Sequence, residues 1–170
     1  MSTSRRDVRM LGVLITASLV ALGGAGIALL PGSTPAAGGP PAAHAEDIDI
    51  AFRQGVALLQ ARQHGHAMQA FHRVLAFAPA MPEAHANMGF ALAGLGRHRE
   101  ARAYFEGALD LRPSQLNAYY GLAVAAEALG DLDTARGAMR TYAHLAPAAD
   151  PFRRRAEAAL WEWSERKPSP

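Results

Sequence analysis

The stretch that decides the fold is residues 82–115, which read PEAHANMGFALAGLGRHREARAYFEGALDLRPSQ. This segment is 34 residues long, and its pattern recurs at the same step before and after it. The recurring positions are Pro79, Pro113 and Pro147; Gly55, Gly89 and Ala123; Ala67, Ala101 and Ala135; Phe71, Phe105 and Met139; and Phe77, Leu111 and Leu145. A fixed period of this kind indicates one supersecondary unit that occurs three times. Because one unit cannot bury its own apolar face, we expect the three units to stack on one another.

Each unit contains two predicted helices, which we call the A helix and the B helix. In the middle unit the A helix covers about residues 82–95 and the B helix about residues 99–111. Apolar and small residues in both helices follow the spacing of one helical face. Leu95-Gly96 and Leu129-Gly130 are expected to end A helices, since glycine readily adopts the left-handed conformation found there. The recurring prolines are expected to end the B helices, because the residue before proline disfavours the helical region.

The middle unit resembles a tetratricopeptide repeat. Five of its positions carry the residue type typical of that family, namely Gly89, Ala101, Phe105, Ala108 and Pro113. The resemblance implies an all-α solenoid of helical hairpins over residues 47–149, in the units 48–81, 82–115 and 116–149.

A further amphipathic helix is predicted over residues 150–166, ahead of a short tail at 167–170. Asp150-Pro151 has the pattern of a helix start, with an acidic N-cap and a proline in the first helical position. One face of this helix is apolar and carries Phe152, Ala156, Ala159, Leu160 and Trp163. We expect this helix to cover the last apolar face of the solenoid.

The N-terminal part of the chain has a different composition. Residues 10–30 carry no charge, and a helix of 21 residues would be about 30 Å long, which matches a bilayer core. Three arginines lie in residues 1–9, so the N-terminus is predicted to stay inside and the rest to be exported. Residues 31–46 are rich in proline, glycine and alanine and are predicted to be a linker. Two interpretations compete here: an uncleaved anchor in a bacterial inner membrane, or a signal peptide cleaved after Ala45, which would leave a soluble periplasmic protein.

Several function classes have little support. Residues 46–170 carry fourteen basic and fourteen acidic side chains, so we expect no nucleic-acid partner, which would require a concentrated basic face. The chain has no cysteine, which excludes disulfides and cysteine-ligated metals. No nucleophile or paired carboxylates occur in a catalytic pattern, so we expect neither an enzyme nor a bound cofactor. The seven histidines suggest a metal, but Leu132 occupies the position of His64 and His98 in the third unit.

The resemblance also implies a functional surface, because A helices of this family line a concave groove. The side chains expected there are Phe52, Arg53, Val56, Asn87, Phe90, Tyr120, Val124 and Glu127. Phe52, Phe90 and Tyr120 are expected to face the groove at positions that helix packing does not need. Asn87 matches one residue of the clamp that holds chaperone C-termini in similar proteins, but Phe52 and Val56 replace two others. An apolar groove with a few polar anchors suits a peptide or an amphipathic helix.

The sequence therefore predicts a non-enzymatic scaffold that holds a partner protein on the exported side of the membrane during assembly of a complex. One alternative is a self-assembling structural protein, in which the uncovered face of the first unit stacks on another copy. A second alternative is a metal carrier or enzyme accessory subunit that uses the histidines.

Overall fold

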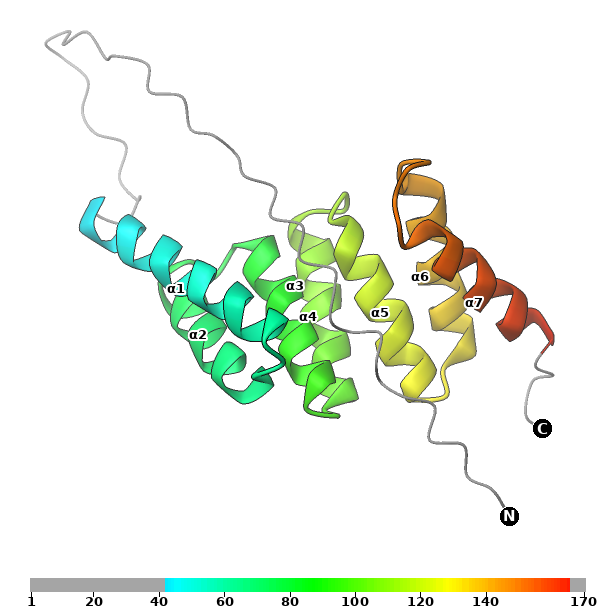
Figure 1. Cartoon of the computed structure of the whole chain (residues 1–170), viewed down its shortest axis with the longest axis horizontal. Helices are drawn as coiled ribbons and strands as arrows, with labels where there is room; N and C mark the ends of the chain where they lie inside the picture. Colours follow the sequence, from blue (N-terminus) through cyan, green and yellow to red (C-terminus); the bar gives the residue numbers. More distant parts are fainter. Residues whose placement is uncertain (1–41, 166–170) are drawn as a thin grey trace, which may run out of the picture.

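A computed structural model describes residues 42–165, which form seven α-helices joined by short turns (Figure 1). The helices are α1 (Ala42–Gln60), α2 (His64–Phe77), α3 (Pro82–Gly94), α4 (His98–Leu111), α5 (Leu116–Ala128), α6 (Leu132–Leu145) and α7 (Arg153–Glu165). Residues 42–165 contain no β-strand. The prediction of an all-α solenoid with three hairpins and a C-terminal helix is confirmed for this part of the chain.

The helices form two layers along one row, with α1, α3 and α5 in one layer and α2, α4 and α6 in the other (Figure 1). Every helix packs against the next one in sequence. In addition, α1 contacts α3 and α3 contacts α5, so neighbouring A helices touch each other directly. Because the A helices approach one another more closely than the B helices do, the A layer forms the concave side of the solenoid.

Glycines in the A helices allow the two helices of a hairpin to approach closely. A Cβ atom placed on Gly55 would lie 2.7 Å from the Phe71 ring, and one on Gly89 would lie 2.7 Å from the Phe105 ring. Both phenylalanines are fully buried. The recurring small position and the recurring aromatic position therefore form one interlocking contact between the A and B helices.

The turns between A and B helices use a left-handed residue, as the sequence predicts. Gly96 has φ +76° and Gly130 has φ +80°, and each follows the last turn of an A helix. The corresponding residue of the first hairpin is Arg62, with φ +58°. A side chain in this region costs about 1–2 kcal/mol relative to a right-handed residue. The first hairpin therefore has a strained turn where the other two have glycine.

The first helix begins earlier than the sequence predicts. Residues 42–46 were expected to end the linker, whereas α1 starts at Ala42. The His44 ring stacks on the Phe77 ring of α2 with centroids 5.6 Å apart, which gives this extra turn a tertiary contact. The proposed cleavage point after Ala45 therefore lies within a helix.

The last helix begins later than predicted, at Arg153 instead of near Asp150. The Asp150 carboxylate accepts hydrogen bonds from the Phe152 backbone N–H and from the Tyr142 hydroxyl, each at 2.8 Å. It therefore stabilises a turn before the helix rather than the first helical turn. Burial, together with this hydrogen bond, raises the pKa of the Tyr142 phenol, so the group stays neutral.

The predicted membrane segment, residues 10–30, and the linker up to residue 41 lie outside the described residues. Among residues 42–165, no helix has the length and hydrophobicity needed to cross a membrane.

Candidate partner-binding groove

The residues predicted to line the groove all come from the A helices α1, α3 and α5, and they differ widely in exposure. Phe52 and Val56 on α1 and Val124 on α5 are half-buried and keep part of their apolar surface in contact with solvent. Arg53 is exposed and forms an ion pair with Asp49 at 2.9 Å on the same helix. The first and third A helices thus provide an accessible apolar surface.

Phe90 and Tyr120 differ from the sequence expectation, because helix packing does require them. Each has only 6% of its surface exposed to solvent. The Phe90 ring makes an edge contact with Phe105 at 4.9 Å, and the Tyr120 ring contacts Tyr142 at 5.3 Å. Both aromatics therefore point toward the B helix of their own hairpin. The physical reason is that α3 is surrounded by α1, α2, α4 and α5, so little of its circumference is left free.

Asn87, in the middle of the A layer, is the most unusual polar residue of this face. It is the one polar side chain among the described residues that is classed as buried, with 5% of its surface exposed. Its amide makes no hydrogen bond in the described part of the chain. Its polar atoms are not fully enclosed and keep a small contact with solvent. Buried amides in proteins are normally hydrogen-bonded, so this group is available to a partner.

Glu127 lies at the C-terminal end of the A layer and joins it to the last helix. Its carboxylate accepts a hydrogen bond of 2.8 Å from the indole N–H of Trp163 on α7. Tyr120, about two turns earlier on α5, also contacts α7 through the Phe152 ring at 5.9 Å. Glu127 therefore holds α7 against α5, a structural role that the sequence analysis did not assign to it.

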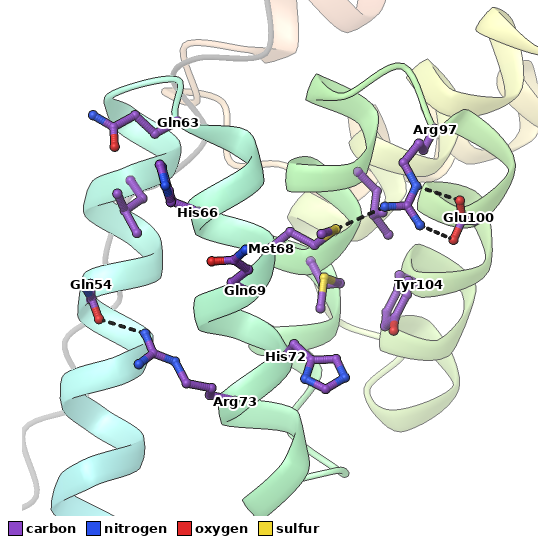
Figure 2. A pocket seen from close by; sticks show the side chains of 13 residues that line it. Gln54, Gln63, His66, Met68, Gln69, His72, Arg73, Arg97, Glu100 and Tyr104 are labelled. Atoms are coloured by element: carbon purple, nitrogen blue, oxygen red, sulfur yellow. Dashed lines mark hydrogen bonds and ion pairs between the residues drawn. The ribbon is translucent and has the colours of Figure 1, made fainter.

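A hollow of about 890 Å³ lies on the B-helix side of the solenoid, mainly between α2 and α4 (Figure 2). Met68, Met88 and Leu92 supply its apolar surface. Arg97 crosses its rim, forms two hydrogen bonds to Glu100 at 2.6 and 2.7 Å, and reaches the Met68 sulfur at 3.2 Å. The sequence analysis did not predict this hollow.

A charge pair bridges the next joint along the solenoid. Arg102 takes the place of Met68 one unit later, and Asp131 takes the place of Arg97. These two side chains form an ion pair at 2.8 Å between α4 and the turn before α6. Hydrogen bonds from Thr134, together with Arg102, lower the pKa of Asp131 and keep it ionised. In the first joint Arg97 and Glu100 pair with each other on one side of the hollow. Arg73, which also lines the hollow, donates a hydrogen bond to the neutral amide of Gln54.

The histidines do not form a metal site within residues 42–165. No group of three or more histidine, aspartate or glutamate side chains there is placed to bind an ion. His64 and His98 are instead packing residues, and the Nδ1 atom of each is enclosed without a hydrogen-bond partner. The His64 ring lies against Gly94, where a Cβ atom would be 2.4 Å from Nδ1.

Comparisons with known proteins agree with this architecture. Residues 87–151 match the family model described as tetratricopeptide repeat. No curated protein sequence matches the chain. Similar solved structures include the first tetratricopeptide domain of Spaghetti (RPAP3) bound to the HSP90 peptide SRMEEVD. That structure has 19% identity and a TM-score of 0.65, with 71% of this chain and 92% of that chain covered.

Two further structures have the same fold. The TPR2B domain of yeast Sti1, in a complex with an Hsp70 peptide, has 20% identity and a TM-score of 0.65 over 71% of this chain and 98% of that chain. The type III secretion translocator chaperone SycD of Yersinia enterocolitica has 11% identity and a TM-score of 0.66 over 71% and 85%. At these identities the likeness establishes the fold, and together with the family match it supports a tetratricopeptide repeat protein.

Proposed function

We propose that this tetratricopeptide repeat solenoid is a non-enzymatic binding module whose A-helix face holds a segment of another protein. The observation that carries the proposal is Asn87, a nearly buried amide without a hydrogen bond on the middle A helix. The polar atoms of Asn87 have only a small contact with solvent, so a partner that supplies a donor or an acceptor can give this amide a hydrogen bond that the described residues do not. Such a group favours a ligand with a polar atom at this position of the groove.

The chemistry of the groove favours an apolar segment as the ligand. Phe52, Val56 and Val124 present partly exposed hydrocarbon on either side of Asn87. Arg53 is paired with Asp49, and Lys167, the one lysine of the chain, is far away in the sequence. A ligand rich in carboxylates would find few cations in this groove. We therefore propose an apolar peptide or the apolar face of an amphipathic helix, docked against the A layer.

The proposed location follows from the N-terminal sequence. The uncharged residues 10–30 and the arginines before them favour an anchor in the inner membrane of a bacterium, with the solenoid on the exported side. A linker of proline, glycine and alanine would hold the solenoid away from the bilayer. Protease treatment of intact and of permeabilised cells tests this location. The proposal requires cleavage of the solenoid once the outer barrier is opened, and cleavage only after the inner membrane is broken would contradict it.

Site-specific photo-crosslinking in cells tests the groove. A photoreactive amino acid in place of Val124, in the groove, is compared with one in place of Arg140, an exposed residue of α6. The proposal predicts one discrete crosslinked protein from position 124 and none from position 140. Equal crosslinking from both positions would show that the A layer has no special role.

Self-assembly through the first unit is a second candidate, and one observation favours it. Ile50 is 50% exposed, whereas Ala84 and Ala118, at the same position of the next units, are fully buried. Within residues 42–165 the end of the row beside α1 is therefore uncovered. However, the exposed Gln54 of α1 accepts a hydrogen bond from Arg73 at 3.0 Å, so the surface is partly adapted to water. If copies stack here, Ile50→Asp will lower the sedimentation mass of the protein, and an unchanged mass would reject this candidate.

A further inference from the structure

The last helix, α7, has two different faces. Its inner face buries Phe152, Ala156 and Trp163 against the solenoid, and the Trp163 backbone carbonyl accepts a hydrogen bond of 2.5 Å from Arg136. Its outer face is fully accessible and carries Arg154, Ala158, Trp161 and Glu165. Trp161 is 70% exposed, more than any other large hydrophobic side chain of the described residues. The inner face accounts for the position of α7 at the end of the row (Figure 1), but it leaves Trp161 unexplained.

The repeat period shows that the exposure of Trp161 is unusual for its position. In steps of 34 residues, Trp161 corresponds to Leu59 in α1, Ala93 in α3 and Glu127 in α5. Leu59 and Ala93 are 5% and 3% exposed, and Glu127 is half-buried. Among the residues that the structure describes, the outer face of α7 is therefore exposed at a position that the A helices cover.

The four residues of this face have the spacing of a helix–helix seam. They follow one another at steps of four, three and four residues, which is the spacing of the contact positions in a two-helix coiled coil. In an antiparallel pair of identical helices centred midway between residues 159 and 160, Trp161 lies opposite Ala158 of the second copy. Arg154 then lies opposite Glu165 of the second copy. A large side chain meets a small one, and a cation meets an anion.

The charges on this face are free to form that pairing. Neither Arg154 nor Glu165 makes an ion pair within residues 42–165, whereas the neighbouring Glu157 is already paired with Arg153 at 3.2 Å. A parallel arrangement would place Arg154 against Arg154 and lose both pairs. We propose that α7 binds α7 of a second copy of this chain in an antiparallel two-fold contact centred on Trp161.

The contact is small, since a helix of 13 residues is about 20 Å long, so we expect a reversible dimer. It differs from the self-assembly candidate above, which uses the opposite end of the row. None of its residues is among those proposed to hold the groove ligand. Attachment of both copies to one membrane would strengthen such a contact by raising the effective concentration.

Sedimentation equilibrium of the full chain in density-matched detergent tests the proposal. We expect a monomer–dimer equilibrium whose dissociation constant rises at least about tenfold in Trp161→Ala, as is typical for a central tryptophan of an interface. Leu129→Ala, which shortens an exposed side chain outside the seam, is the matched control and should leave the equilibrium unchanged. Far-UV circular dichroism confirms that each variant is folded.

Charge reversal decides the orientation. Arg154→Glu alone should weaken the dimer, because it opposes two acidic groups at each end of the seam. The double variant Arg154→Glu with Glu165→Arg should restore it, since the pairs re-form with exchanged signs. A protein that stays monomeric at all concentrations would overturn the proposal. A dimer whose dissociation constant is unchanged by Trp161→Ala would also overturn it, as expected if the N-terminal apolar segment formed the dimer. So would a double variant that dimerises as weakly as the single variant.

Discussion

The substitution Gly121→Ala should destabilise the solenoid although it improves helix propensity. Gly121 lies in the interior of α5, and a Cβ atom there would be 2.3 Å from two carbons of the Phe105 ring of α4. That distance is far shorter than any van der Waals contact. Gly89 of α3 approaches the same ring, and a Cβ atom there would be 2.7 Å away. Phe105 is fully buried between these helices and cannot swing into solvent.

The magnitude follows from two opposing effects. Replacing glycine by alanine inside a helix stabilises it by about 1 kcal/mol. Adding a methyl group to a tightly packed interior costs about 1–3 kcal/mol, toward the upper end where the neighbour cannot move. We therefore expect Gly121→Ala to lower the free energy of unfolding by about 1–2 kcal/mol. Gly137→Ala in α6 is the matched control: it has no atom within 4 Å of the new Cβ, so it should raise stability by up to about 1 kcal/mol.

Urea unfolding followed by circular dichroism at the helical band measures both variants against the parent protein. The double variant Gly121→Ala with Phe105→Leu should lose less than the two single changes together, because the smaller side chain leaves room for the methyl group. If Gly121→Ala stabilised the protein as much as Gly137→Ala does, the proposed interlocking of α4 with α3 and α5 would be refuted.

Three further changes test other parts of the structure. Arg62→Gly should raise stability by about 1 kcal/mol, because glycine removes the cost of φ +58°, and no gain in thermal unfolding would contradict the strained turn. Burial, with Arg62 nearby, lowers the pKa of His64 below its usual 6.5, so the unfolded chain binds the proton more readily and stability should fall as pH drops below about 6.5. His64→Leu, which copies Leu132 of the third unit, should reduce that pH dependence, and an identical pH profile would reject this assignment. Tyr142→Phe should cost about 1 kcal/mol through the lost hydrogen bond to Asp150, as urea unfolding would show, and a neutral effect would contradict it.

The sequence period predicted the architecture because it records the contacts that every unit makes. The small residues at Gly55 and Gly89 and the aromatic residues at Phe71 and Phe105 meet as predicted, and Gly96 adopts the expected left-handed turn. These contacts are local to one hairpin, so one unit of sequence is enough to infer them.

The groove was predicted less well, because exposure depends on helices that are distant in the sequence. The apolar pattern of one helix predicts a single buried face. Because α3 contacts helices on several sides, Phe90 is buried as well. Glu127 was expected in the groove and is instead hydrogen-bonded to Trp163, 36 residues later. Asn87 was expected in the groove from the clamp position that it matches, but its burial and its lack of a hydrogen bond depend on the surrounding helices, so the sequence did not predict them.

The central claim is that Asn87 on the A-helix face binds a segment of a partner protein. The most direct test is the yield of the crosslinked partner from position 124 in cells that carry Asn87→Leu. Gln69→Leu, which replaces an exposed amide on α2, is the control. We expect Asn87→Leu to lower the yield at least about tenfold at unchanged helicity, while Gln69→Leu has no effect. An undiminished yield from Asn87→Leu would show that Asn87 takes no part in binding the partner.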